Sequence, residues 1–272
     1  MNAKRFFVNI FRILIVGIAV MLVGSSSAYA ANTSQPASFQ TGERLVYEIA
    51  WSGFIGGEAV IQINGQTTRD GNRVLLISTA ARSTGLARAL YPVEDTSLSY
   101  FDIDNLRSYG ADIHITENNY KKHTEITFDH KRGIAIYKVD GGEPQEYPIA
   151  PNTNDAFSAI YAFRVLRNQA KIGESVSLPV FDDRKQHDLI IKTIRKEKIM
   201  LKNRSVDTLM TTFFLESGGL FQVKGDMTIW FSDDAAFAPI KIKASAPIGE
   251  FTMLLKEWSG VNFKIAPFRT QK

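Results

Sequence analysis

The stretch that decides the fold is Asn154–Ala170, which reads N-D-A-F-S-A-I-Y-A-F-R-V-L-R-N-Q-A. Asn154 or Asp155 can cap a helix here, because a short side-chain oxygen accepts hydrogen bonds from the free N–H groups of a first turn. Apolar side chains then cover all but a narrow strip of the helix. A helix of this kind is buried on several sides. We therefore expect residues 154–170 to form a helix held inside a curved sheet.

Most of the remaining chain after residue 40 alternates apolar and polar side chains, as at Leu45, Tyr47, Ile49 and Trp51. A period of two is typical of half-buried β-strands. About fourteen short strands at regular spacing, separated by turn residues, predict an antiparallel sheet. Open twisted sheets rarely exceed about ten strands without closing or splitting. The predicted fold is therefore all-β: a highly curved antiparallel sheet of about fourteen strands, as a β-spiral or incomplete barrel, around one buried helix.

Three segments interrupt this pattern. Residues 82–92 break the alternation and predict a short helical turn. Residues 187–195 and 197–201 are interpreted as two separate strands. Gly225 lies inside a strand expected over 221–231, where a glycine usually marks a bulge or a tight bend.

The first 30 residues have the features of a secretory signal peptide. Lys4, Arg5 and Arg12 form a basic region, residues 13–23 an apolar region too short to span a bilayer, and Ala28–Ala30 an A-x-A cleavage site. We expect cleavage after residue 30 and export to the periplasm, with secretion as the second choice. The mature chain is not expected to span a membrane.

The predicted domain organisation is simple. After the signal peptide, residues 31–40 form a flexible leader and residues 41–260 one curved β domain. Residues 261–272 are expected to be a loosely held tail. About 220 residues suit a single domain, because sandwiches and barrels of this size are often undivided.

Composition excludes several classes of function. The chain has no cysteine, so disulfides and thiol catalysis are excluded. Three of its 32 basic residues and none of its 28 acidic residues lie in the first 30, which leaves 29 basic against 28 acidic side chains. Nucleic-acid binding draws on a basic excess to neutralise phosphates. We therefore expect no nucleic-acid partner.

No motif for catalysis, cofactor binding or metal binding occurs. The sequence lacks nucleotide-binding glycine motifs and a G-x-S-x-G elbow. His114 and His123 flank a predicted hairpin and can approach each other across it, but no pair has the H-x-x-x-H spacing of a helical zinc site. The acidic pairs 182–183 and 233–234 follow strands, where Asp usually forms turns. We predict no enzyme activity, no catalytic residue, no cofactor and no metal.

The helix supplies the candidate site residues. Arg164 lies in the middle of its apolar surface, and a buried Arg needs an acidic partner. Asp95 is the predicted partner. Side chains that could border a ligand are the large aromatic residues of the helix and two strand tryptophans: Phe157, Tyr161, Phe163, Trp51 and Trp230.

Several segments together resemble an uncharacterised family of exported bacterial proteins, the domain-of-unknown-function family 3108. The matching segments occur in order along the chain: G-E-R-L-V-Y-E-I-A-W-S-G-F-I-G-G-E-A from Gly42, L-Y-P-V-E-D from Leu90, F-D-H from Phe128, D-A-F-S-A-I-Y-A-F-R from Asp155, I-W-F-S-D-D from Ile229 and P-I-G-E-F from Pro247. The resemblance implies an exported β-rich protein and supplies no reaction. At the level of fold alone, the expected architecture is similar to periplasmic β-spiral envelope proteins and to the half-barrels that carry lipoproteins.

Three hypotheses of function remain open. The first is a non-catalytic periplasmic protein of cell-envelope assembly or integrity that binds a lipid-like ligand, a lipoprotein or another envelope protein. The second is a hydrolase of envelope polymers that uses Asp or Glu residues. The third is a structural adaptor without a ligand cavity. An apolar cavity would favour the first, converging carboxylates the second and a filled core the third.

Overall fold

The computed structural model describes residues 39–216, 227–246 and 249–266. The predicted signal peptide and most of the predicted leader lie outside the described residues, as does Gly225. Among the residues that are described, no helix is both long and apolar enough to cross a membrane.

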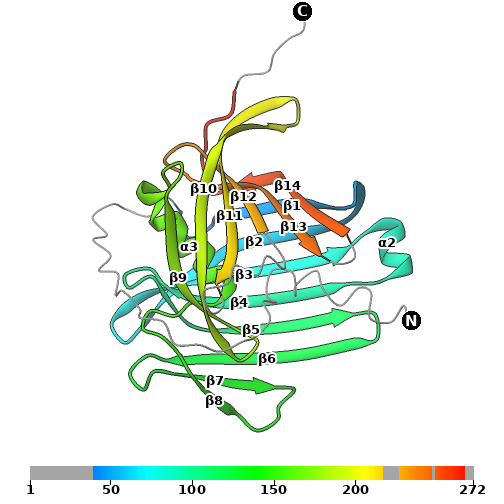
Figure 1. Cartoon of the computed structure of the whole chain (residues 1–272). Helices are drawn as coiled ribbons and strands as arrows, with labels where there is room; N and C mark the ends of the chain where they lie inside the picture. Colours follow the sequence, from blue (N-terminus) through cyan, green and yellow to red (C-terminus); the bar gives the residue numbers. More distant parts are fainter. Residues whose placement is uncertain (1–38, 217–226, 247–248, 267–272) are drawn as a thin grey trace, which may run out of the picture.

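Fourteen strands form one sheet, and every pair of neighbours is antiparallel (Figure 1). The strands are β1 (Arg44–Trp51), β2 (Phe54–Arg69), β3 (Asn72–Ser83), β4 (Glu94–Asp102), β5 (Arg107–Glu117), β6 (Tyr120–Asp129), β7 (Ile134–Val139), β8 (Gln145–Pro148), β9 (Ser175–Asp182), β10 (Lys185–Leu201), β11 (Arg204–Glu216), β12 (Met227–Ser232), β13 (Pro239–Ala246) and β14 (Gly249–Ser259).

Two meanders make up this sheet. Strands β1 to β8 follow one another in space, as do β9 to β14, and pairing of β1 with β14 joins the two groups. The edges are therefore β8 and β9, and the sheet does not close. The predicted curved, incomplete barrel is confirmed. The predicted break between residues 195 and 197 is wrong, because β10 continues through it with a register shift between Thr193 and Arg195.

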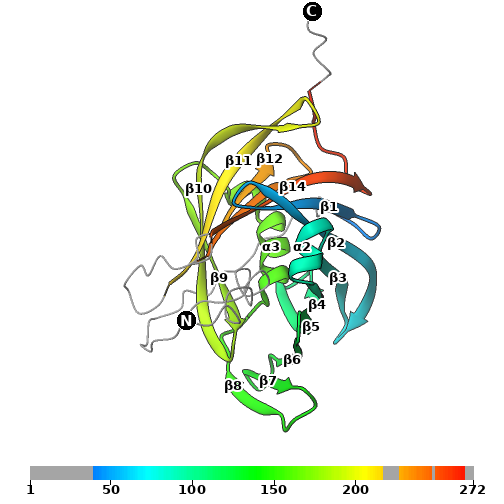
Figure 2. The same cartoon turned by 90° about the vertical axis from the view of Figure 1, so that its right-hand side faces the viewer.

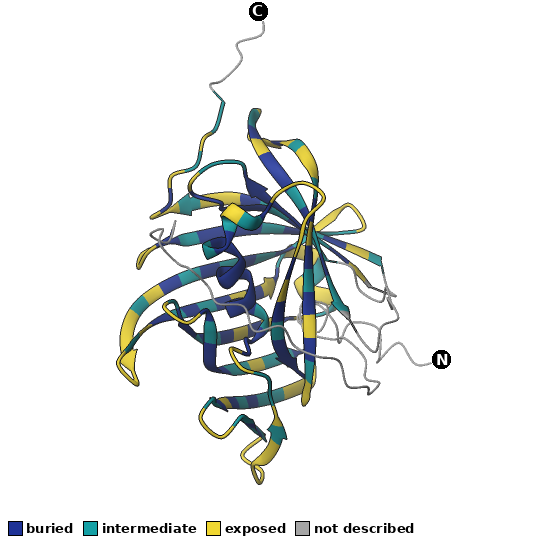
Figure 3. Ribbon diagram, turned by 60° about the vertical axis from the view of Figure 1, so that its left-hand side comes forward, coloured by how far each residue is buried: buried dark blue, intermediate teal, exposed yellow. Residues whose placement is uncertain are grey.

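The predicted helix lies between the two halves of the sheet (Figure 2). Helix α3 (Ala156–Val165) is followed by a 3-10 turn, η2 (Arg167–Gln169). The carboxylate of Asp155 caps α3 by accepting hydrogen bonds from the N–H groups of its first turn. Every side chain from residue 157 to 164 is buried (Figure 3). The helix is therefore buried on several sides, as its apolar residues predicted.

The chain just before α3 connects the edge strand β9 to β5 in the other half of the sheet. Asn154 forms a parallel bridge with Val180 of β9, and the Thr153 carbonyl accepts the Ser108 N–H of β5. The ring of Phe181 on β9 packs against Phe128 on β6, with centroids 5.8 Å apart. Side chains therefore occupy part of the opening between the two halves of the sheet, which no strand pairing closes.

A second, short helix occupies the predicted helical turn. Helix α2 (Gly85–Leu90) follows β3 and packs on the start of β2, where the Thr84 N–H donates to the Gly56 carbonyl. In Figure 1 it lies at the end of the sheet where β3 ends and β4 begins.

Both ends of the described chain are held more firmly than expected. Phe39, at the end of the predicted leader, is buried against Tyr161 of α3. The tail was predicted to be loose from residue 261, but Val261 is buried and the Ala266 N–H donates to the Ser205 carbonyl of β11. The prediction is therefore wrong for residues 261–266.

Candidate functional site

An apolar cavity lies at the α2 end of the barrel, between α2 and the ends of β1, β2, β3 and β14. Its volume is about 300 Å³. We call it the α2 cavity. Its lining is mainly aliphatic, aromatic or small: Ile49, Trp51, Phe54, Ile55, Gly56, Gly57, Ala81, Arg82, Ser83, Leu86, Ala87, Leu90, Tyr91, Val93 and Phe251.

Two glycines let α2 approach the sheet closely. A Cβ atom on Gly56 would lie 3.0 Å from the Cβ of Ala87, and one on Gly57 would lie 2.9 Å from the Arg82 carbonyl oxygen. Any side chain at either position would therefore push α2 or β3 away. Gly56 thus allows the close approach of α2, and Gly57 allows the close approach of β3.

The rim of the α2 cavity exposes four large apolar side chains. Phe54 and Ile55 stand at the tip of the β1–β2 hairpin, with exposures of 79% and 65%. Leu86 and Leu90 lie one turn apart on α2, with exposures of 85% and 84%. Soluble proteins rarely gather exposed apolar residues at one place without a binding role. The rim is therefore the strongest surface indication of a ligand.

The inner wall of the α2 cavity leads towards α3. Ile49 and Ala81 line it and also line a second void of about 20 Å³, which Phe157 and Ile160 of α3 border. The second void holds little more than a water molecule. A ligand bound in the α2 cavity would therefore not reach α3.

Polar groups are few and lie at one side of the α2 cavity. The Ser83 hydroxyl accepts a hydrogen bond from the Val93 N–H at 2.9 Å. Burial raises the pKa of Tyr91, and the carboxylates of Glu117 and Asp95 raise it further. Burial also raises the pKa of Asp95 to about 6, while the Thr116 N–H acts in the opposite direction. Arg82 also lines the α2 cavity and forms an ion pair with Glu58 at 2.9 Å. The polar lining therefore consists of hydroxyl groups and one paired cation.

The structure brings two of the five predicted ligand residues to this region. Trp51 lines the α2 cavity, and its ring stacks on Phe251 with centroids 6.4 Å apart. Phe157 borders only the smaller void.

The other three predicted ligand residues lie elsewhere. Phe163 is fully buried and packs against Phe231, with ring centroids 5.5 Å apart. Tyr161 donates its hydroxyl to a buried carboxylate, as described below. Trp230 is buried on β12, where its indole N–H donates to Glu197 at 3.2 Å. These three side chains stabilise the fold and do not line the α2 cavity.

The partner of Arg164 is Glu43, so the predicted pairing with Asp95 is wrong. The Arg164 guanidinium donates to both Glu43 oxygens, at 2.5 and 2.9 Å, and both side chains are fully buried. Tyr161 donates to the same carboxylate at 2.9 Å. Asp95 instead accepts the Thr116 N–H at 2.8 Å. On β4 it is opposite Ala81, a residue that lines the α2 cavity.

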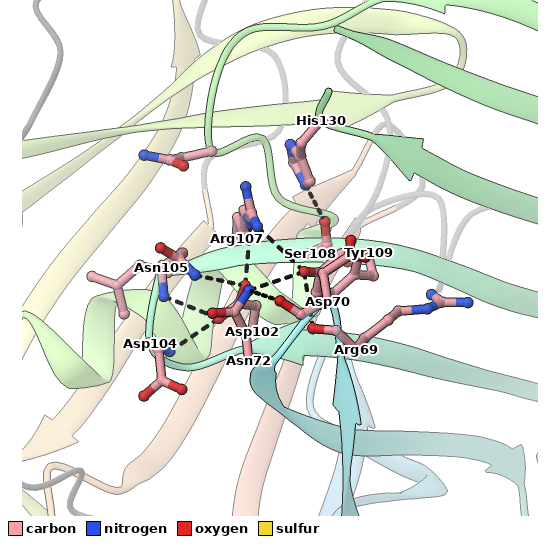
Figure 4. A network of polar contacts seen from close by, with 12 residues as sticks. Arg69, Asp70, Asn72, Asp102, Asp104, Asn105, Arg107, Ser108, Tyr109 and His130 are labelled. Carbon is pink, nitrogen blue, oxygen red and sulfur yellow. Dashed lines mark hydrogen bonds and ion pairs between the residues drawn. The ribbon is translucent and has the colours of Figure 1, made fainter. Parts of the chain in front are cut away.

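A polar network near the start of α3 has a structural role (Figure 4). Asp102, at the end of β4, accepts hydrogen bonds from the backbone N–H groups of Asp104 and Asn105 and from the side chain of Arg107. Ser108 donates to the capping carboxylate of Asp155 at 2.7 Å. The carboxylates in this network are engaged in holding the β4–β5 loop and the helix start.

The acidic pair after β12 is engaged in the same way. Asp233 forms an ion pair with Lys196 at 2.7 Å. Asp234 accepts from the Ser232 hydroxyl and the Ala236 N–H, which organises the β12–β13 turn. Neither carboxylate is arranged with the other as an acid–base pair.

The rim residues could have been found in the sequence. Phe54 and Ile55 occupy a turn flanked by glycines, where large apolar side chains are unusual. Leu86 and Leu90 have the i, i+4 spacing of one helix face, in a segment that breaks the strand alternation. The sequence does not show that the two segments meet.

One of three similar solved structures has a TM-score above 0.5. A β-barrel-like protein of the domain-of-unknown-function family DUF1849 from Brucella abortus has a TM-score of 0.54 and 8% identity, covering 80% of this chain and 96% of that chain. This likeness concerns the fold alone. A candidate exported protein with a YmcC-like fold from Bacteroides fragilis has a TM-score of 0.34 and 10% identity, covering 82% and 100%. A candidate lipoprotein from Parabacteroides distasonis has a TM-score of 0.32 and 11% identity, covering 83% and 100%.

No curated protein matches the sequence. The family model described as protein of unknown function, DUF3108, matches residues 46–256, which include all of β1 to β13 except the first two residues of β1, and most of β14. With well over half of its length matched, this chain belongs to the DUF3108 family.

Proposed function

We propose that this protein is a non-catalytic binding protein of the cell envelope that holds the acyl chain of a lipid-like ligand in the α2 cavity. The observation that carries the proposal is an apolar cavity that opens beside four exposed apolar side chains. Ligand sites are typically apolar concavities of about 300–1,000 Å³ with a few polar groups. The α2 cavity, at about 300 Å³, suits one short or partly inserted chain.

The lining supports an acyl chain over a polar or aromatic guest. Small residues such as Gly57 and Ala81 leave a smooth channel, and Trp51 and Phe251 supply an apolar wall. A guest with several polar groups would lose hydrogen bonds to water without replacing them there. The Tyr91 hydroxyl can meet a polar headgroup at one side.

A place in the envelope follows from the signal-like N-terminus, which predicts export. Periplasmic localisation, with secretion as the second choice, remains part of the proposal. In that compartment a protein that shields a single apolar chain could assist transfer or retention of a lipid or of an acylated protein.

A pair of variants on α2 tests the proposal. Ala87 lines the α2 cavity, whereas Ala89 is exposed on the same helix and does not line it. Ala87→Phe should place a ring in the space of the guest, and Ala89→Phe should place the same ring in solvent. The purified mature protein is titrated with dansyl-labelled undecanoic acid, and its fluorescence reports transfer of the dansyl group out of water.

We expect saturable binding with one site in the wild type and in Ala89→Phe. Ala87→Phe should weaken binding at least about tenfold, which corresponds to ~1.4 kcal/mol. Equal binding by the two variants, or no saturable binding by the wild type, would reject the acyl-chain site. Urea unfolding of each variant shows whether the added ring has changed the fold.

A structural adaptor is the second candidate. It is favoured by the packing around α3, where Phe163, Phe231 and Phe237 fill the interior. If the wild type binds no probe, the adaptor role becomes the leading proposal.

A further inference from the structure

Two histidines face each other across the β5–β6 hairpin. His114 of β5 is directly opposite His123 of β6 in the antiparallel register. Their imidazole rings are stacked, with centroids 4.0 Å apart and planes inclined by 9°. A two-residue turn at Asn118 and Asn119 joins the strands, so the pairing is local and its register is fixed by the turn.

One carboxylate joins the two rings. Asp112 lies two residues before His114, on the same face of β5. Its Oδ1 lies 2.7 Å from His114 Nε2, and its Oδ2 lies 3.2 Å from His123 Nε2. Both rings therefore direct the same nitrogen towards the same carboxylate.

These three side chains place their ligand atoms within 4.8 Å of one another. In a tetrahedral site with metal–ligand distances of about 2.0–2.1 Å, ligand atoms lie about 3.4 Å apart. A ring nitrogen binds a metal in the plane of its ring, so the two stacked rings would rotate to direct both Nε2 atoms at one ion. The side chains of His114, His123 and Asp112 are 55%, 34% and 37% exposed, so solvent can supply the remaining ligand.

The surroundings fix the backbone and add negative charge. The His123 N–H donates to Asp140 Oδ1 at 2.7 Å, which ties β6 to the end of β7. Glu125 is directly opposite Asp112 and forms an ion pair with Lys138 at 3.1 Å. On the other side, Thr96 of β4 is opposite His114. Lys138 is thus engaged by Glu125. Lys121, two residues before His123 on the same face of β6, is exposed and adds one positive charge, against the three carboxylates of Asp112, Glu125 and Asp140.

We propose that His114, His123 and Asp112 form a binding site for a divalent late first-row transition metal, for which Zn²⁺ is the first candidate. Two neutral imidazoles and one carboxylate suit such ions, whereas Mg²⁺ and Ca²⁺ favour oxygen ligands alone. The bound ion would join β5 to β6 on the face opposite the core residue Ile113. This site is separate from the α2 cavity, and the inference does not depend on the acyl-chain proposal.

Calorimetric titration of the untagged mature protein with ZnCl₂ at pH 7.5 tests the site. We expect one ion per chain, with affinity reduced at least about tenfold in His114→Gln, in His123→Gln and in Asp112→Asn. Thr96→Ala, on the strand next to His114, is the control and should bind as the wild type does. At pH 5.5 the affinity should fall, because protons compete with the metal for its ligand atoms.

Two further measurements separate a built site from scattered surface binding. Zn²⁺ should raise the thermal unfolding midpoint of the wild type and of Thr96→Ala, but not that of the double variant His114→Gln/His123→Gln. Co²⁺ should give the intense visible absorption of four-coordinate cobalt. The proposal is overturned if the wild type binds no Zn²⁺ at about 0.1 mM, or if the double variant binds it as tightly as the wild type.

Discussion

The guanidinium of Arg164 and the carboxylate of Glu43 form a two-point ion pair between residues 121 positions apart. Glu43 directly precedes β1, and Arg164 lies in the last turn of α3. The remaining guanidinium donors reach the carbonyl oxygens of Phe237 and Ala236, at 3.1 and 3.2 Å. One side chain therefore connects the helix to the start of the first strand and to the β12–β13 turn.

Removal of either charge alone should destabilise the fold. Breaking a buried ion pair by removing one partner costs about 3–5 kcal/mol, because the other charge stays buried. Arg164→Met should lower the free energy of unfolding by that amount. Glu43→Leu/Arg164→Met should regain part of the loss, but not the part due to the unpaired carbonyls of Ala236 and Phe237 and to the Tyr161 hydroxyl, which loses its acceptor. Urea unfolding measures all three free energies. A double variant no more stable than Arg164→Met would refute this account of the pair.

The aromatic cluster around α3 should tolerate truncation poorly. Phe163 is fully buried, so Phe163→Ala should cost about 3–5 kcal/mol through lost burial and an added void. Phe54→Ala removes the same ring from an exposed position at the rim of the α2 cavity and should cost less than about 0.5 kcal/mol. Denaturant unfolding measures both values. Similar losses in the two variants would mean that the rim is buried in solution, for example against another molecule.

Asp95 should make stability depend on pH. Its pKa rises from 3.8 to about 6 in the folded protein, chiefly because of burial. The folded state then binds the proton more tightly than the unfolded state, so the stabilising effect is complete below pH 3.8 and is lost as pH rises through about 6. Asp95→Asn, which mimics the protonated acid, should gain stability relative to the wild type between pH 4 and pH 7.

The comparison of the two chains removes the contributions of other titrating groups. Burial lowers the pKa of His130 and of His187, and both remain in the variant. A stability difference between wild type and Asp95→Asn that stays constant from pH 4 to pH 7 would contradict the raised pKa.

A glycine in β5 should be irreplaceable. Gly110 has a φ of 139°, and a Cβ atom there would overlap the Ile126 carbonyl oxygen of β6. Gly110→Ala should cost at least about 1–3 kcal/mol from the backbone conformation alone. Gly65→Ala, in β2, meets no atom within 4 Å and is the matched control. Thermal unfolding distinguishes the two. Equal thermal unfolding midpoints for Gly110→Ala and Gly65→Ala would contradict the prediction and would mean that β5 relaxes around the new methyl group.

The sequence was sufficient to predict the helix, the curved sheet and the burial of Arg164. Each follows from a pattern within a short window: the apolar surface of residues 154–170 and the period of two along the strands. The strand-length error at residues 195–197 also has a local cause, because a register shift interrupts the alternation without ending the strand.

The partner of Arg164 and the site could not be predicted in this way. Glu43 and Asp95 are both acids next to predicted strands, and only the pairing of β1 with β14 places one of them beside α3. The α2 cavity likewise needs the β1–β2 turn and α2 to meet. The approach of His114 to His123 could be predicted from the sequence, because the register of a hairpin relates residues that are close in sequence. The position of Asp112 beside the Nε2 atoms of both rings depends on side-chain conformations, which the strand pattern does not specify.

The pairing of β1 with β14 has a consequence for how the chain could be rearranged. The first and last strands are neighbours in the middle of the sheet, and the two edges fall in the middle of the sequence. Gly42 and Gly260 lie so close that a Cβ atom on Gly260 would overlap the Gly42 carbonyl. A short linker could therefore join them. New ends placed between α3 and β9 would give a circular permutant in which all fourteen strands follow one another as a single up-and-down meander, with β9 first and β8 last.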